Sequence, residues 1–179
     1  MAMAHTARKV AERFDIVLID APPRLTAGAI NAFCASTHLL VPTVYDGLSA
    51  EAVGTFLNGA RILRDALNPG IDLLGVVGML TAQQGSLAVR EENAKRTAIQ
   101  QVAQTWSPNH YFFDRHIPRR AAIAVSAGER IAYFCDSTVK EWFDELGADM
   151  SCRLGWGAEG KVEHDRVQSR NVAALLRAS

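Results

Sequence analysis

The residue best placed to do chemistry follows an apolar run near the start of the chain. Residues 16–19 are all β-branched or leucine, Asp20 follows them directly, and Pro22 and Pro23 come next. Such a run predicts a strand covered on both faces, and prolines, which lack an N–H, end its ladder. Asp20 would then lie at the carboxyl edge of a sheet, where an aspartate meets Mg²⁺ or its water shell. The alternative is an ordinary loop aspartate.

The elements that must position this aspartate alternate between strand and helix patterns. We expect strands over 14–20, 38–44, 72–80 and 111–114, helices over 4–12, 26–35, 49–67, 86–105 and 137–147, and a loop or helical turn over 119–126. Helix-length crossovers predict an α/β fold, with the first three strands parallel in one sheet and helices on both faces. Asp20, Thr43 and Leu80 should then share one carboxyl edge. Gly147 is expected to end the last helix.

Composition bounds the class of protein. The chain has 179 residues, of which 49% are hydrophobic and 21% charged, as in a folded domain. We expect one domain over 1–148 and a linker and tail over 149–179, partly helical. The 19 Lys and Arg residues equal the 19 Asp and Glu residues, so any contact with nucleic acid must come from a local patch.

Cysteine usage and hydropathy indicate the compartment. Cys34, Cys135 and Cys152 are widely spaced and form no Cys-x-x-Cys pair, which argues against a disulfide framework or a zinc site. No apolar run approaches the roughly 20 residues that span a bilayer, and the start carries no signal-peptide pattern. We therefore expect a cytoplasmic protein without a membrane partner.

A resemblance to a known family rests on an ordered series of motifs. After Asp20 and the two prolines come an Asn-Ala pair, a strand ending in Val-Pro, and an Ile-Pro-Arg string. These are Asn31-Ala32, Val41-Pro42 and Ile117-Pro118-Arg119. Over roughly residues 10–147 their order and spacing resemble the ParA/MinD family of deviant-Walker ATPases, which act in plasmid and chromosome partition.

The resemblance implies a P-loop NTPase fold of the SIMIBI type, with ATP and Mg²⁺ as cofactors. Asp20 would be the Walker B aspartate that holds a Mg²⁺-bound water, with Pro22 beside the nucleotide. Pro118 and Arg119 would form the adenine-side wall. The chain departs from the family at Met79, where the family has a polar Thr or Asn near the base.

The family's glycine-rich phosphate loop has no counterpart in this sequence. No Lys-Gly-Gly-x-Gly-Lys-Thr/Ser string occurs among the 179 residues, so the chain looks like the carboxyl-terminal part of such an ATPase, without the amino-terminal βαβ portion. In the family's fold the phosphate-loop strand lies between the strands expected here at 14–20 and 38–44. We expect these two to pair directly, or to pair across an interface with another chain, and we expect the isolated chain to be inactive as an ATPase.

Basic residues suggest a further contact. ParA-like proteins hold DNA nonspecifically through basic side chains, and the matching positions here are Arg90, Lys95, Arg96 and Arg120. The alternative is a solvated helix face of mixed charge.

Three functional interpretations remain open. The chain is a ParA-like partition protein with an incomplete nucleotide site, or a non-catalytic module that pairs with a complete ParA-like subunit, or a truncated remnant. A homodimer is the other partnership that the family implies.

Overall fold

A three-stranded parallel sheet forms the centre of the molecule. The computed structural model describes residues 10, 14–22, 24–83, 86–106, 112–125, 131–156 and 176–177. The strands of this sheet are β2 (His38–Thr43), β3 (Asp72–Thr81) and β4 (Phe112–Pro118), in the order β2-β3-β4. The central strand β3 is buried along most of its length, as expected for a continuously apolar parallel strand. The predicted α/β fold with a parallel sheet is confirmed.

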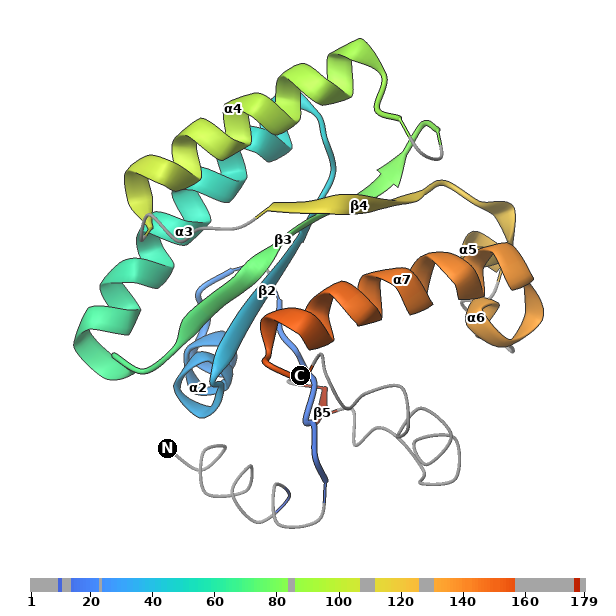
Figure 1. The fold of residues 1–179 in the computed structure, drawn as a ribbon. Helices are drawn as coiled ribbons and strands as arrows, with labels where there is room; N and C mark the ends of the chain where they lie inside the picture. The colour runs from blue at the N-terminus through green and yellow to red at the C-terminus, as the bar shows by residue number, and fades with distance from the viewer. Residues whose placement is uncertain are drawn as a thin grey trace.

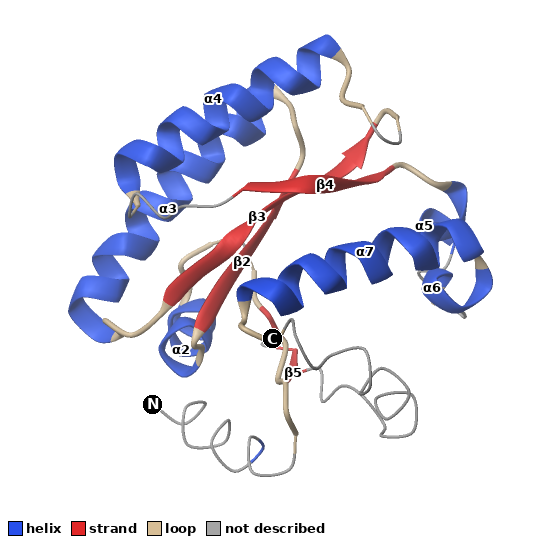
Figure 2. Cartoon of the chain, viewed as in Figure 1, coloured by secondary structure: helices blue, strands red, loops and turns tan. Residues whose placement is uncertain are grey.

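Helices cover both faces of this sheet (Figures 1 and 2). The described helices are α2 (Ala27–Ala35), α3 (Gly47–Leu67), α4 (Val89–Thr105), α5 (Ala121–Val125), α6 (Ala132–Cys135) and α7 (Ser137–Arg153). Helices α3 and α4 run side by side on one face, and α7 lies on the other (Figure 1). Side-chain caps fix where three helices begin. Thr26, Asp46 and Asp136 accept backbone N–H hydrogen bonds from the first turns of α2, α3 and α7, respectively.

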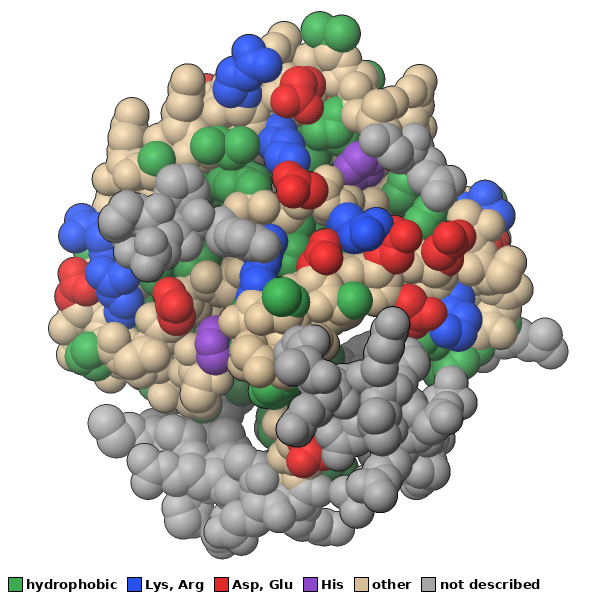
Figure 3. All heavy atoms as spheres, viewed as in Figure 1, with side chains coloured by type: hydrophobic (Ala, Val, Ile, Leu, Met, Phe, Trp, Pro, Cys, Tyr) green, Lys and Arg blue, Asp and Glu red, His purple; other side chains and the backbone are tan. Residues whose placement is uncertain are grey.

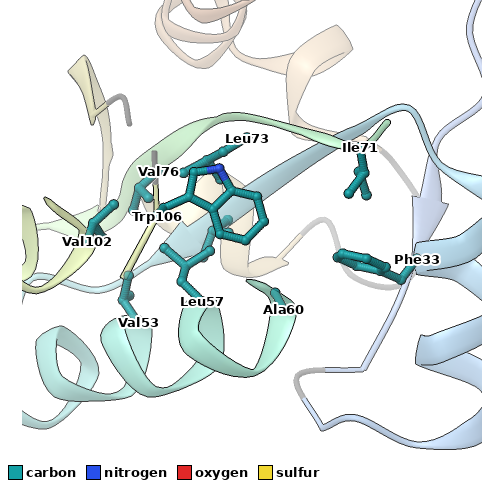
Figure 4. Close-up of a cluster of buried hydrophobic side chains, with 10 residues drawn as sticks. Phe33, Val53, Leu57, Ala60, Ile71, Leu73, Val76, Val102 and Trp106 are labelled. Carbon is teal, nitrogen blue, oxygen red and sulfur yellow. The ribbon is translucent and has the colours of Figure 1, made fainter. Parts of the chain in front are cut away.

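Two hydrophobic clusters hold the layers together. On the α3 and α4 face, Trp106 packs near Leu57 and Val76 (Figure 4), and Leu57 and Val76 are completely buried. On the opposite face, Phe113 of β4 packs with residues of α7 that include Trp142. Each cluster includes side chains from the strands, so the apolar residues of the sheet stabilise the helices packed on both of its faces.

The end of α7 is anchored on the sheet by an arginine. The guanidinium of Arg153 lies 3.2 Å from the ring centroid of Phe113, and its Nη1 donates to the carbonyl of Leu74 at 2.8 Å. A Cβ on Gly75 would lie 2.3 Å from that Nη1, so the glycine provides the space. Burial lowers the pKa of Arg153 to about 10.

The first predicted strand is the main correction. Of residues 14–20, only Ile19–Asp20 form a strand, β1, which pairs in parallel with β5 (Leu176–Arg177) in a separate two-stranded sheet. The predictions that 14–20 joins the main sheet and that it pairs with 38–44 are wrong, whereas pairing with another chain stays a prediction. Ile16 and Leu18 are 55% and 57% exposed. An apolar run predicts a buried strand only where neighbouring segments exist to cover it.

Smaller differences concern element ends. Gly147 does not end α7, which continues to Arg153, because an isolated glycine costs a helix only about 1 kcal/mol and Leu146 and Met150 on either side pack into the core. Strand β4 is longer than expected, and α6 was not predicted. The helix expected over 4–12 lies outside the described residues apart from Val10. The domain boundary at 148 stays a prediction, with α7 running across it.

A glycine in β3 makes room for Tyr45, the second residue after β2. Tyr45 is 4% exposed, and a Cβ on Gly78 would lie 2.2 Å from its ring. Burial raises the pKa of Tyr45 above its ordinary value. This contact fixes the chain where it leaves β2 for α3.

We predict that Gly78→Ala destabilises the protein by about 1–3 kcal/mol, because the methyl group overpacks against Tyr45. Gly147→Ala is the matched control, since no atom lies within 4 Å of the position that a Cβ would take there, and it should stabilise α7 by roughly 0.5–1 kcal/mol. Urea unfolding of the two variants measures both values. Equal stability of the two variants would contradict the close contact.

Candidate functional site

A hollow lies at the carboxyl edge of the main sheet. Strands β3 and β4 are parallel, so their ends at Thr81 and Pro118 meet there. The hollow has a volume of about 420 Å³, and its lining is mainly aliphatic with two arginines: Leu80, Arg119, Arg120, Ala121, Ile123 and Ala124. The carboxyl edge is where open parallel sheets bind ligands.

Leu80 enters the hollow in an unusual backbone conformation. Its φ is 57°, in the left-handed region that bulky residues rarely adopt, and its side chain is 43% exposed. Two hydrogen bonds from Arg119 hold this end of β3: its N–H donates to the Thr81 carbonyl at 2.9 Å, and its Nε donates to the Leu80 carbonyl at 3.1 Å. Strain of this kind persists where surrounding contacts fix it, and it is common at ligand sites.

Arg120 connects the hollow to the start of α7. Its Nε and Nη2 donate to the two carboxylate oxygens of Asp136, at 2.8 and 3.3 Å. Asp136 in turn accepts the N–H groups of Thr138 and Val139. The bond from Arg120, followed by the helix N–H bonds, holds the pKa of Asp136 below its ordinary value. Arg120 therefore has a structural partner.

The loop after β3 is closed by residues that the sequence reasoning missed. Glu91 accepts from the N–H of Ala82 at 2.7 Å and from the N–H of Ala88 at 3.0 Å. The Nε2 of His116 lies 3.2 Å from the carbonyl oxygen of Gln83. A signal for Glu91 exists, because it stands at the third position of α4, where a glutamate commonly reaches back to the helix start. Nothing in the sequence signals the conformation of Leu80.

The nucleotide-site residues expected from the sequence fall into two groups. Arg119 lines the hollow, and Pro118 is buried at the end of β4 beside it. Asp20 and Pro22 are exposed and do not line the hollow, and Asp20 belongs to the β1–β5 sheet. Of the expected shared edge, Thr43 and Leu80 lie in the main sheet, whereas Asp20 does not.

The described residues do not form a magnesium centre by themselves. Within the described ranges, no group of three or more His, Cys, Asp or Glu side chains gathers around one point. Mg²⁺ is commonly held by one or two carboxylates together with phosphate oxygens, so Asp20 would depend on a bound phosphate for the remaining ligands. Its role in holding Mg²⁺ stays a prediction.

The basic residues expected to contact DNA point in different directions. At about 100° per residue, Lys95 and Arg96 lie about 140° and 240° around α4 from Arg90. The Nζ of Lys95 lies 3.4 Å from the Phe113 carbonyl oxygen, and Arg120 pairs with Asp136 at the start of α7. On the face drawn in Figure 3, acidic and basic side chains are interspersed. Contact with DNA through these residues stays a prediction.

Comparisons with known proteins found a matching family model and several similar proteins. A family model described as an AAA domain matches residues 1–73. The chromosome-partitioning ATPase Soj of Thermus thermophilus is 33% identical over 140 residues, which cover 74% of this chain and 51% of Soj. The sporulation initiation inhibitor protein Soj of Bacillus subtilis is 26% identical over 102 residues, or 56% of this chain and 40% of that protein.

A solved structure shares the fold. The structure of apo McdA from Cyanthece matches 85% of this chain and 57% of the McdA chain, with a TM-score of 0.68 and 17% sequence identity. The fold is therefore that of the ParA-like P-loop NTPases, and the sequence is similar to those of the Soj partition proteins. It spans about half the length of the curated relatives it matches. No helix in the described ranges is both long and apolar enough to cross a bilayer.

The conformation of Leu80 gives a prediction with an inverted order of stability. In a strand, alanine normally makes a protein more stable than glycine does by about 0.5–1 kcal/mol. A residue that has a Cβ is destabilised by about 1–2 kcal/mol when its backbone is left-handed. Leu80→Gly should therefore be more stable than Leu80→Ala by roughly 0.5–1 kcal/mol. Thermal and urea unfolding of the two variants measure the difference, and the normal order would show that the backbone at Leu80 is unstrained.

The Arg120–Asp136 ion pair gives a prediction about how stability changes with pH. Asp136→Asn keeps a side chain that caps α7 but loses the charge, so it should be less stable than the native protein at neutral pH and more stable than Asp136→Ala. Because folding lowers the pKa of Asp136, the charge stabilises the fold above the unfolded pKa and this stabilisation is lost as pH falls through the folded pKa. Urea unfolding should therefore show the native protein and Asp136→Asn converging in acid. A constant difference in stability would argue against the ion pair.

Proposed function

We propose that this chain acts in ParA-like, ATP-dependent segregation of a plasmid or chromosome, and that the hollow holds the base of the nucleotide. The observation that carries the proposal is the position of the hollow, at the carboxyl edge of a parallel sheet of the P-loop NTPase type, beside Pro118 and Arg119. Its aliphatic lining suits the faces of a planar ring, and an arginine guanidinium stacks on such rings.

The groups that would bind the phosphates of a nucleotide are incomplete in this sequence. Most of the affinity for a nucleotide comes from phosphate contacts, made by backbone N–H groups and lysines, and the 179 residues contain no phosphate-loop string. Positioning and charge neutralisation of the γ-phosphate supply nearly all the acceleration in phosphoryl transfer. The chain by itself therefore binds nucleotide weakly and does not hydrolyse it.

A second candidate is a non-catalytic module that pairs with a ParA-like subunit. It is favoured by β2, which has no strand partner on its outer side among the described segments. In either case the proposal includes a cytoplasmic location, which the free cysteines Cys34, Cys135 and Cys152 support.

Nucleotide binding tests the proposal directly. Competition with a fluorescent adenosine derivative should give dissociation constants for ATP with Mg²⁺ and for adenosine that agree within about threefold, because few phosphate contacts contribute. Ala124→Glu places a carboxylate in the hollow and should abolish binding. Ala103→Glu, at an exposed position of α4, is the matched control and should not.

Two results would contradict the proposal. If Ala124→Glu leaves nucleotide binding unchanged, the base does not bind in the hollow. ATP bound far more tightly than adenosine, together with phosphate release that depends on Asp20, would show that the isolated chain has a complete catalytic site.

A further inference from the structure

Two buried polar atoms near the carboxyl edge of the main sheet lack a hydrogen bond. The hydroxyl of Tyr45 and the Nδ1 of His116 are both inaccessible to solvent, and neither bonds to any residue that the structure describes. Tyr45 as a whole is only 4% exposed. A buried polar group without a hydrogen bond destabilises a fold, and native proteins pair nearly all such groups with protein atoms or with ordered water. Two of them in one region therefore require an explanation.

Both atoms lie on the face of the sheet that α3 and α4 cover. Tyr45 packs with Ala94 of α4, and its hydroxyl lies 2.9 Å from the position that a Cβ on Gly78 would take. His116 is the register partner of Gly78 on the neighbouring strand β4. The next residue, Ile117, packs under α7, so the His116 side chain points to the opposite face, on which Tyr45 lies.

The second ring nitrogen of His116 has a partner, and this partner determines the tautomer. The Nε2 atom lies 3.2 Å from the carbonyl oxygen of Gln83, in the loop after β3. A carbonyl oxygen only accepts hydrogen bonds, so Nε2 must carry the proton. In the neutral ring Nδ1 is then an acceptor that needs a donor. Burial raises the pKa of Tyr45, so the Tyr45 hydroxyl stays protonated and can donate.

The charged side chains around Tyr45 do not supply that donor. The Nζ of Lys95 lies 6.0 Å from the centroid of the Tyr45 ring and donates instead to the carbonyl of Phe113 at 3.4 Å. The carboxylates of Glu92 and Asp114 act on the pKa of Tyr45 by their charge, and an ionised carboxylate cannot donate a hydrogen bond. The Tyr45 hydroxyl is therefore the donor that this part of the chain offers to the imidazole.

We propose that one buried water molecule joins the Tyr45 hydroxyl to Nδ1 of His116, and that this bridge fixes the tautomer with which His116 holds the loop after β3. Adjacent strands are about 5 Å apart, so a hydroxyl beside Gly78 is within reach of one water from the imidazole on the paired residue. A buried water needs at least two polar partners, and these two atoms provide them.

Tyr45 is then a positioning residue for a loop that it does not touch. It acts through His116 on Gln83, three residues beyond Leu80 at the rim of the hollow. The inference does not depend on nucleotide binding at the hollow.

Nitrogen NMR of the imidazole tests the tautomer in the full chain. In mildly alkaline buffer, long-range proton–nitrogen correlation should show His116 with its proton on Nε2. Tyr45→Phe removes only the hydroxyl and should shift the Nδ1 resonance and raise the fraction of the other tautomer. Tyr133→Phe is the matched control, because it removes a hydroxyl that donates to Asp144, and it should leave the His116 signals unchanged.

A double-mutant cycle measured by urea unfolding tests the bridge. Tyr45→Phe should lower the equilibrium constant for folding by about 3–10-fold, the worth of one hydrogen bond. His116→Gln keeps an amide that can donate to Gln83 but has no acceptor at the place of Nδ1. In that background Tyr45→Phe should be neutral or stabilising, because the hydroxyl it removes has lost its partner.

A crystal structure of the native protein should place a water within hydrogen-bond distance of both atoms. Direct contact between the two atoms, with no water, would overturn the proposal. A proton on Nδ1 in the native protein, or His116 signals that Tyr45→Phe does not change, would overturn it as well. So would an equal loss of stability on Tyr45→Phe in the native and His116→Gln backgrounds.

Discussion

The rest of the structure depends on the hydrogen-bonded ladder on both sides of β3. This strand pairs with β2 and with β4, and its side chains enter the clusters on both faces of the sheet. Val76 belongs to the cluster under α3 and α4, whereas Val77 belongs to the cluster under α7. One strand thus fixes the position of two helical layers, and the helices need no direct contact with each other across the sheet.

The same ladder creates the candidate site. Because β3 and β4 are parallel, Leu80 and Pro118 reach the same edge, and Arg119 bonds back to the end of β3. Arg120 extends the connection to the first turn of α7 through Asp136. The hollow is therefore shaped by groups tied to strands and to a long helix, which explains how Leu80 is held in a left-handed conformation.

The sequence predicted those elements whose signals are local. Helix α3 has apolar spacing and an aspartate cap, and β3 is a long apolar run, so both were expected to within two residues of their observed ends. The strand expected over 14–20 is longer than β1. An apolar sequence indicates that a segment favours burial, but it does not indicate which neighbouring segment will cover it. Gly147 was misjudged because packing outweighed its weak local preference.

In the candidate site, too, some residues carry a local sequence signal and others do not. A short motif marks Pro118 and Arg119, which lie at the hollow, and their role in binding nucleotide stays a prediction. Glu91 stands at a recognisable capping position. Leu80 carries no sequence signal, since its conformation results from bonds donated by a residue 39 positions away. The pairing of β1 with β5 likewise depends on long-range contacts. Asp20 was expected at one carboxyl edge with Thr43 and Leu80, but its sequence motif does not determine which sheet its strand joins.

Native-state hydrogen exchange measured residue by residue tests the central claim, that β3 forms the core and that residues 14–18 lie outside the main sheet. The account predicts that interior amides of β3 exchange only through global unfolding. It also predicts that amides of 14–18 exchange at nearly unprotected rates. Protection of 14–18 equal to that of β3 would contradict the account, because it would mean that this segment is a fourth strand of the sheet.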